Sequence, residues 1–306
     1  MQSNADMKVN IGTLELKNPI IAASGTFGFG QEYADFFDLN EIGAISVKAL
    51  TLEPRHGNPP PRVAETPAGM LNSVGLQNPG VKSFLKYNLP FLKKYDLKII
   101  VNIAGNTADE YAELAAILDA ADIDAFEVNV SCPNVTHGGS AFGISCTGVA
   151  EITERVRRVT KKPVIVKLTP NVTSISEIAK AAEAAGADSV SLINTILGMV
   201  IDIRTKRPIL HQNVGGLSGP AVRPIAVRMV NEVFRAVKIP IIGMGGIMHF
   251  EDAVEFMLAG AAACMIGTAS FITPTACMDI ARDLERYCNE FGVSRVTDLI
   301  GAVQLY

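Results

Sequence analysis

Runs rich in valine and isoleucine alternate along this chain with alanine-rich segments of helical periodicity, and this alternation restricts the folds that the chain can adopt. It is typical of parallel βα units, in which a helix joins each strand to the next. The runs that predict strands are Asn18–Gly25, Gly43–Leu50, Lys98–Gly105, Ala125–Cys132, Pro163–Thr169, Ser189–Thr195, Ile239–Gly245 and Ala263–Thr268. The segments that predict helices include Thr107–Ala121, Val149–Val159, Ser174–Ala185, Pro220–Val237 and Phe250–Ala259.

Eight such units within about 250 residues predict an α/β fold of the (β/α)8 TIM-barrel type. The 48% hydrophobic content of the 306 residues is enough for the core of one large domain, residues 1–306. An open doubly wound sheet is the alternative, and it is disfavoured because no G-x-G-x-x-G turn follows an early strand. Ahead of the first strand, Lys8–Leu16 predicts a small hairpin at the bottom of the barrel.

Three of the predicted βα connections are long, namely Thr51–Pro79, Pro133–Thr147 and Ile196–Gly219. Long connections in a compact domain are usually functional. All three follow the C-terminal ends of strands, so we expect them to form loops that gather over one mouth of the barrel.

Charge and cysteine usage argue against several classes of protein. Charged residues make up only 19% of the chain, the net charge is −4 and no run is rich in lysine or arginine, so nucleic-acid binding is not expected. The five cysteines form no C-x-x-C pair, so neither a disulfide framework nor a zinc or iron–sulfur site is indicated. The polar N-terminus and the lack of an apolar run near ~18 residues predict no signal peptide and no membrane span. We therefore expect a cytoplasmic location.

The segment from Asn129 to Asn134 places a thiol at the end of a predicted strand. Pro133 ends the strand because proline cannot donate to a ladder, and this leaves Cys132 between two asparagines. Most free cysteines are small buried hydrophobic residues, and a lone cysteine here would be interpreted in that way. The flanking amides and the other polar strand ends favour a chemical role instead.

Polar side chains stand near the C-terminal ends of the other predicted strands as well. They include Ser24, Lys48, Asn102, Lys167, Asn194 and Thr195. Each residue taken alone has an ordinary structural explanation. A lysine can extend its ammonium group to solvent, and an amide or hydroxyl can cap a loop. However, lysine is almost never fully buried without a partner, and an unpaired buried amide is costly. With Asn129 at the end of its strand, two lysines and three asparagines together therefore predict a polar ligand at this mouth.

Glycines follow the seventh and eighth predicted strands, where barrels often bind phosphate through backbone N–H groups. Gly245 and Gly246 end one strand, and Gly267-Thr268 ends its neighbour. The nearby Gly216-Leu-Ser-Gly219 offers a further contact to phosphate or a lid. A Gly-x-Gly-Gly run alone is more often tight-turn chemistry, and it is the pair of ends that favours a phosphate site.

Several motifs resemble those of class 1 dihydroorotate dehydrogenases, in order and over essentially the whole chain. They are Ser-Val-Lys-Ala-Leu-Thr from Ser46, Leu-Asn-Ser-Val-Gly-Leu-Gln-Asn-Pro-Gly from Leu71, Asn-Val-Ser-Cys-Pro-Asn from Asn129, Val-Lys-Leu-Thr-Pro from Val166 and Gly-Met-Gly-Gly-Ile from Gly243. The resemblance implies a barrel that carries one FMN and oxidises dihydroorotate to orotate in pyrimidine (UMP) biosynthesis. Class 2 enzymes are membrane-associated and use serine as the base, whereas this chain carries Cys132.

The resemblance also implies roles for individual residues. Cys132 would be the base, and Lys48 and Lys167 would complete the catalytic set. The implied FMN contacts are Ser24, Lys48, Ala49, Asn102, Asn129, Lys167, Ile193, Gly219, Gly245, Gly246, Gly267 and Thr268. The implied substrate contacts are Lys48, Asn72, Ser73, Val74, Gly75, Leu76, Asn129, Asn194 and Thr195.

Thr205-Lys-Arg-Pro and Gly215-Gly-Leu-Ser-Gly-Pro-Ala look like the NAD-linked type B branch of class 1. That branch implies a partner subunit with FAD and a [2Fe–2S] cluster, and a homodimer of this chain joined by two such electron-transfer subunits. The alternatives are a fumarate-using class 1 enzyme that works without a partner and another FMN barrel, such as a tRNA dihydrouridine synthase. A phosphate-sugar isomerase, which needs no flavin, and a non-catalytic flavin-binding scaffold are further alternatives.

Overall fold

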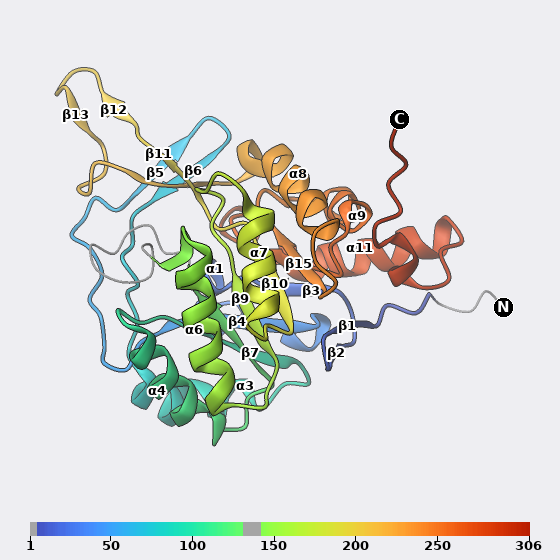
Figure 1. Cartoon of the computed structure of the whole chain (residues 1–306). Coiled ribbons are helices and arrows are strands. Elements are labelled where there is room, and N and C mark those ends of the chain that lie inside the picture. Colours follow the sequence, from blue (N-terminus) through green and yellow to red (C-terminus); the bar gives the residue numbers. More distant parts are fainter. Residues whose placement is uncertain (1–4, 131–141) are drawn as a thin grey trace.

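The computed structural model describes residues 5–130 and 142–306, and their central feature is a closed barrel of eight parallel strands (Figure 1). The barrel order is β10-β15-β16-β3-β4-β7-β8-β9. These strands are β3 (Ile20–Ala22), β4 (Ala44–Leu50), β7 (Lys98–Ile103), β8 (Ala125–Asn129), β9 (Val164–Lys167), β10 (Ser189–Leu192), β15 (Ile241–Met244) and β16 (Ala263–Ile266). All eight predicted strands and the TIM-barrel fold are confirmed. The predicted runs are longer than the strands at one or both ends; Pro163–Thr169 and Ser189–Thr195, for example, continue past the last ladder residues Lys167 and Leu192.

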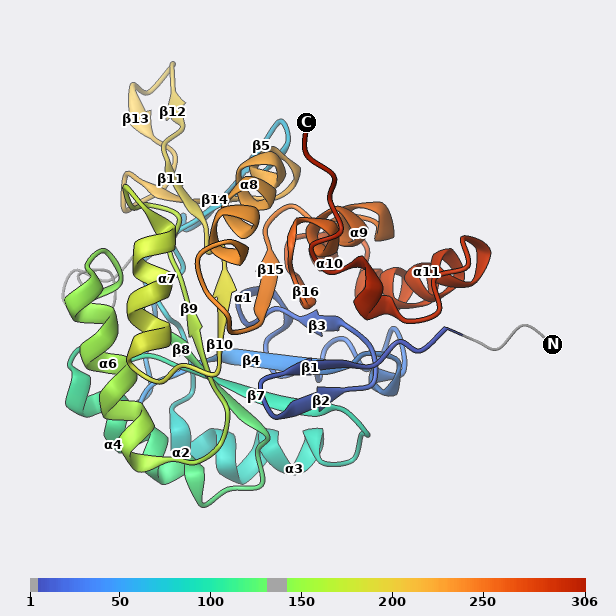
Figure 2. The ribbon, with the colours of Figure 1, turned by 45° about the vertical axis from the view of Figure 1, so that its right-hand side comes forward.

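Helices surround the barrel, as Figure 2 shows, so the strands are covered on their outer face. The main ones are α4 (Ala108–Asp119), α6 (Cys146–Val159), α7 (Ile175–Ala184), α8 (Arg223–Phe234), α9 (Phe250–Ala259) and α11 (Ala276–Glu290). Three of these helices have a hydroxyl residue as N-cap: Thr107 for α4, Ser145 for α6 and Ser174 for α7. Each hydroxyl accepts a hydrogen bond from a backbone N–H of the first turn. The five predicted helices are confirmed, although Pro220–Val237 is divided into the 3-10 helix η3 (Pro220–Val222) and α8.

Several helices were not predicted. The longest is α11, which buries Ile280 and Leu284 on its inner face. The shorter ones are α1 (Ser24–Phe27), η1 (Leu39–Glu41), α2 (Val81–Ser83), η2 (Phe84–Asn88), α3 (Leu89–Leu92), α10 (Ala269–Ile272) and η4 (Val296–Leu299). Within the described residues, no helix combines the length and the apolar character needed to cross a membrane.

The predicted N-terminal hairpin is confirmed as the antiparallel pair β1 (Val9–Ile11) and β2 (Leu14–Leu16). Its side chains alternate between buried and exposed, so the apolar residues face the core. The turn at Gly12 has φ +61°, and a Cβ there would lie 3.1 Å from Asp188 Cβ. Because Asp188 directly precedes β10, the hairpin lies at the N-terminal end of the barrel.

Two of the long connections were expected to be loops, and this expectation is wrong. They form a second, antiparallel sheet in the order β11-β14-β6-β5, hereafter the mouth sheet. Its strands are β5 (Val63–Thr66), β6 (Gly69–Asn72), β11 (Ile196–Gly198) and β14 (Gly215–Ser218). A hairpin of β12 (Ile201–Asp202) and β13 (Arg207–Pro208) projects beyond it (Figure 1). Most of the third connection, Pro133–Thr147, lies outside the described residues.

Candidate functional site

A pocket lies between the C-terminal ends of the barrel strands and the mouth sheet. It has about 220 Å³ of accessible space. One buried water needs only ~10–15 Å³ on this measure, so the pocket can hold an organic ligand. Such a position, at the C-terminal face of a (β/α)8 barrel, is where enzymes of this fold bind their substrates.

The polar and glycine residues singled out in the sequence meet in this pocket, although they come from distant segments of the chain. From the expected FMN contacts, the lining includes Ser24, Lys48, Ala49, Asn129, Lys167, Ile193, Gly219, Gly245, Gly246, Gly267 and Thr268. From the expected substrate contacts, it also includes Asn72, Val74, Gly75, Leu76, Asn194 and Thr195. Two expected contacts, Asn102 and Ser73, are fully buried and do not line the pocket.

Asn102 and Ser73 each carry a buried polar atom. Asn102 Nδ2 donates to Glu127 Oε2, but Asn102 Oδ1 has no hydrogen-bond partner within the described part of the chain, and neither has Ser73 Oγ. A buried polar atom without a partner costs roughly 1–3 kcal/mol. Both residues lie near the pocket, since Ser73 follows the pocket residue Asn72 in sequence and Asn102 lies on β7, the strand next to that of the pocket residue Asn129.

Lys167 ends β9 with its side chain almost fully buried at the base of the pocket. Its Nζ lies 3.4 Å from Ser24 Oγ and 3.9 Å from Glu127 Oε2. On the next strand, β8, Asn129 lines the pocket, and the hydroxyl of Tyr111 fixes its backbone by donating to Asn129 O at 2.7 Å. The base of the pocket thus carries a cation and an amide on a rigid part of the barrel.

Glu127 was missed in the sequence. It is fully buried on β8 and accepts hydrogen bonds from Ser46 Oγ and Ser191 Oγ, each at 2.8 Å. The available signal was a single acidic residue within the apolar run Ala125–Val130, since glutamate is almost never fully buried unless paired.

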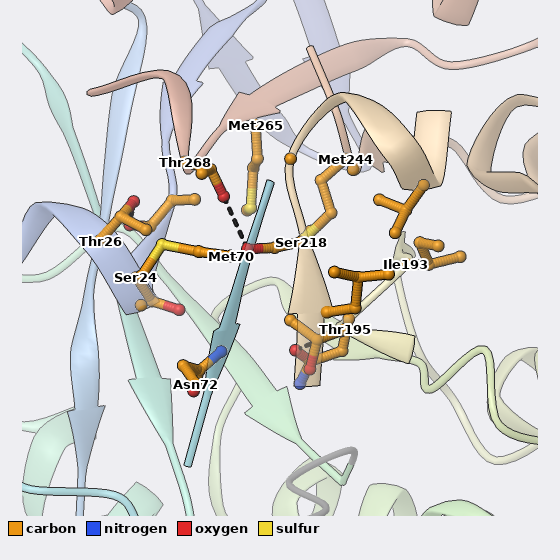
Figure 3. Close-up of a pocket in the computed structure, with 18 of the residues that line it drawn as sticks. Ser24, Thr26, Met70, Asn72, Ile193, Thr195, Ser218, Met244, Met265 and Thr268 are labelled. Atoms are coloured by element: carbon orange, nitrogen blue, oxygen red, sulfur yellow. Dashed lines mark hydrogen bonds between the residues drawn. The ribbon is translucent and has the colours of Figure 1, made fainter. Parts of the chain in front are cut away.

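The mouth sheet closes the pocket from above. Met70 and Asn72 on β6 and Ser218 on β14 face the barrel, as Figure 3 shows. Thr268 Oγ1, just after β16, donates to Ser218 Oγ at 2.8 Å and so links the barrel to the mouth sheet (Figure 3). A ligand in the pocket would therefore be enclosed between the two sheets.

Methionines form much of the apolar wall of the pocket, and no periodic pattern in the sequence predicts them. Met70, Met244 and Met265 carry their side chains into the pocket (Figure 3), and Met248 also lines it. Thioethers are polarizable and make favourable contacts with aromatic rings. The wall therefore suits a flat aromatic ligand.

Glycines leave room where the pocket meets the strand ends. A Cβ built at Gly25 would meet nothing within 4 Å, and one at Gly267 nothing nearer than 3.8 Å. Since both residues line the pocket, side chains there would occupy ligand space. Gly219 and Gly246 have φ +96° and +83°, and a Cβ at Gly246 would lie 2.8 Å from Gly219 O. Glycine is therefore required at Gly246, because two backbone segments approach closely there at positive φ.

The thiols in the described part of the chain are poorly suited to act as a base. Burial raises the pKa of Cys264 and of Cys277 to about 12, and it also raises the pKa of Cys288. Cys146 is exposed at the start of α6. The expected base, Cys132, lies outside the described residues. No group of three or more histidine, cysteine, aspartate or glutamate side chains in residues 5–130 and 142–306 is arranged to hold a metal ion.

Comparison with known proteins identifies relatives along nearly the whole chain. The family model described as dihydroorotate dehydrogenase matches residues 6–288. The chain is 56% identical over 301 residues to a protein of Desulforamulus reducens and 55% identical over 300 residues to one of Thermoanaerobacter pseudethanolicus; both alignments cover 98% of this chain and 99% of the relative. A Bacteroides fragilis protein is 54% identical over 302 residues, with 98% and 100% covered.

All three relatives are named dihydroorotate dehydrogenase B (NAD(+)), catalytic subunit. The family consists of oxidoreductases that in general depend on a flavin. The match of the family model and the near full-length identity lead to one conclusion: this chain belongs to the dihydroorotate dehydrogenase family.

Proposed function

We propose that this chain is the catalytic subunit of an NAD-linked dihydroorotate dehydrogenase that oxidises dihydroorotate to orotate in pyrimidine biosynthesis. The main support for the proposal is that one pocket is lined by two lysines, several asparagines and the glycines at the strand ends. The relatives' shared name gives the reaction its substrate and its final acceptor.

One FMN would occupy the base of this pocket, in a single domain formed by the whole chain. Gly245, Gly246, Gly267 and Thr268 would take its phosphate, because glycine backbone N–H groups can approach phosphate oxygens closely. Lys167 would lie near its ring, and the methionine wall suits a flat ring system. When bound, the flavin supplies the hydride acceptor that the protein itself lacks.

The chain's own residues would manage the proton and the substrate's orientation. Cys132 would take the proton from the carbon next to the one that loses hydride, and a thiolate is a competent base for this step. Lys48 would pair with the substrate carboxylate, and neutral donors and acceptors from Asn72, Asn129 and Asn194 suit an imide edge. The remaining expected substrate contacts are Ser73, Val74, Gly75, Leu76 and Thr195.

The mouth sheet would exclude water while the reaction proceeds. Its link to the barrel through Ser218 and Thr268 holds β14 over the pocket. Exclusion of water strengthens the attraction between Lys167 and any negative charge that develops beside it. Product would leave only when part of this cover moves.

Electrons would leave this chain for a second subunit that carries FAD and a [2Fe–2S] cluster, and two such subunits would join a homodimer of this chain. The support is the name "catalytic subunit" of the relatives and the two motifs from Thr205 and Gly215 that look like the NAD-linked branch. A cytoplasmic location is part of the same proposal.

The absorption spectrum of the purified chain tests the proposal. We expect the yellow absorption of an oxidised flavin, and we expect dihydroorotate to bleach it when oxygen is excluded. Uridine monophosphate, whose pyrimidine ring already has the double bond that the reaction would form, serves as the control ligand and should leave the spectrum unbleached. A colourless chain that takes up no FMN, or a flavin that dihydroorotate does not bleach, would refute the proposal.

A further inference from the structure

Glu127 lies in the interior of the barrel, where it gathers side chains from four other strands. Its carboxylate accepts from Ser46 on β4, Asn102 on β7 and Ser191 on β10, and it forms an ion pair with Lys167 on β9. The side chain is fully buried. Glu127 itself is not used by any step described above.

A buried carboxylate is expensive to maintain, since the effective desolvation penalty is several kcal/mol per ion. Here all four partners can donate, and the Asn102 amide nitrogen and the Lys167 ammonium can only donate. An ionised carboxylate has about four acceptor sites and no donor, so the partners match that form. Packing alone would be served better by an aliphatic side chain of similar volume.

The position of Glu127 relative to the pocket follows from strand geometry. Residues two apart on a strand face the same side, so Glu127 lies on the same face of β8 as Asn129, which lines the pocket. In the ladder between β8 and β9, Lys167 pairs with Asn129, so the lysine lies at the level of the residue that lines the pocket. The Lys167 ammonium therefore lies between a buried carboxylate, 3.9 Å away, and the pocket that its side chain lines.

We propose that Glu127 is a positioning residue, a buried counter-ion that fixes the Lys167 ammonium at the base of the pocket and sets the net charge that a bound flavin meets. The inference rests on the proposed function, because it assumes that FMN occupies this pocket. Ser46 and Ser191 hold the carboxylate in place, because each hydroxyl donates a hydrogen bond of 2.8 Å to it. Glu127 itself touches neither flavin nor substrate.

Lys167 and Glu127 carry opposite charges, so they should shift the midpoint potential of a bound FMN in opposite directions. Reduction brings negative charge into the pocket, and Lys167 favours it while Glu127 opposes it. Glu127→Gln keeps the shape and removes the opposing charge, so the midpoint potential of the bound FMN should rise. Lys167→Met removes the attraction and leaves the carboxylate uncompensated, so the potential should fall. The double variant Glu127→Gln/Lys167→Met should lie between the two single variants.

The experiment is a titration of the midpoint potential for the FMN-loaded full-length chain and these variants. For Glu127→Gln we expect at least a tenfold shift of the equilibrium toward reduced flavin, which is about 30 mV for a two-electron couple. Glu127→Asp, which keeps the charge, should return most of the way to the wild-type potential. Asp188→Asn is the control, because it breaks an ion pair with Arg157 and a hydrogen bond to Val164 N at the opposite end of the barrel.

A potential that Glu127→Gln leaves unchanged, in a variant that binds FMN as the wild type does, would overturn the inference. If Glu127→Gln does not fold, the double variant is compared with Lys167→Met, and equal potentials would overturn it. The proposed function fails differently, since the wild-type chain would then bind no FMN or would not be reduced by dihydroorotate. If Glu127 were purely structural, Glu127→Gln would lower the melting temperature, as we expect for Asp188→Asn, and leave the potential where it was.

Discussion

At the scale of single residues, chemistry in this chain depends on what surrounds each ionisable group. Lys167 and Glu127 are both buried and stand 3.9 Å apart, so each offsets the other's desolvation. The thiols of Cys264 and Cys277 are buried as well, and burial raises the pKa of each to about 12, although a hydrogen bond with Ser270 acts in the other direction at Cys277.

Cys132→Ala should leave FMN bound but slow the reduction of the flavin by dihydroorotate by ~100-fold or more, the scale of a lost acid–base group. The reason is the position of Cys132 in the Asn129–Asn134 motif. Rapid-mixing measurements without oxygen give the rate, and Cys146→Ala, an exposed thiol outside the pocket, is the matched control. Reduction of the Cys132→Ala variant at a rate near that of the wild type would remove Cys132 from this role.

The buried thiols predict a pH dependence of stability. In the unfolded chain a cysteine ionises near 9.0, whereas the folded pKa of Cys264 and Cys277 is about 12. The folded state therefore keeps protons that the unfolded state releases, so their contribution to stability is complete below pH 9 and is lost as the pH rises toward 12. Urea midpoints between pH 8 and pH 10.5 should fall accordingly.

Native-state labelling at pH 8 with a thiol reagent checks the same assignment. Cys146 should react, while Cys264 and Cys277 should react only after unfolding, because the thiolate is the reactive species. Mass spectrometry locates the labels. Fast native labelling of Cys264 or Cys277 would show that the raised pKa is not maintained in solution.

At the scale of elements, the pocket depends on how two sheets approach each other. Gly219 directly follows β14 and Gly246 follows β15, and their backbones come so close that a Cβ on Gly246 would lie 2.8 Å from Gly219 O. The bond between Thr268 and Ser218 joins the same two regions. The mouth sheet is thus fixed to the barrel where we propose that the phosphate binds.

Gly246→Ala should therefore impair both folding stability and FMN binding. A non-glycine residue at positive φ costs roughly 1–2 kcal/mol, and here the contact with Gly219 O adds to it. Gly292→Ala is the matched control, because Gly292 has φ +70° but a Cβ there would meet nothing within 4 Å. Thermal unfolding and FMN titration measure the two effects. Equal losses in both variants, with FMN affinity intact, would show that the contact at Gly246 does not shape the site.

At the scale of the whole molecule, the question is how electrons leave the pocket. The pocket is covered by the mouth sheet, so a second large cofactor is poorly placed to meet a flavin bound beneath it. The relatives are named as catalytic subunits, which implies a partner subunit. A hairpin of β12 and β13 projects from the same side (Figure 2).

The purified chain alone should reduce a small artificial acceptor with dihydroorotate and should reduce NAD only slowly. Addition of a partner that carries FAD and an iron–sulfur cluster should restore NAD reduction. Steady-state assays with and without the partner measure this difference, and the artificial acceptor is the internal control. Efficient NAD reduction by the chain alone would contradict the two-subunit proposal, and rapid turnover with fumarate would instead favour the fumarate-using branch.

The eight barrel strands were predictable from sequence because strand and helix periodicity is local, as is the polar end of each strand. Lys48, Asn129 and Lys167 were placed at the pocket for this reason, since the ends of parallel strands must meet at one mouth. The family motifs contain the same three residues, so the resemblance to the family indicates the same site.

The mouth sheet and the Glu127 cluster were decided only by the tertiary structure. Asn72 and Gly216, 144 positions apart, are joined across the mouth sheet, and no local pattern marks either segment as a strand. Glu127 finds Ser46 at a separation of 81 residues and Ser191 at 64. The sequence by itself determined which side chains stand at the strand ends, because that depends on neighbours along the chain. Which of them share a buried charge, and which segments cover the pocket, was decided by closure of the barrel, because a hydrogen bond requires atoms about 3 Å apart whatever their separation in sequence.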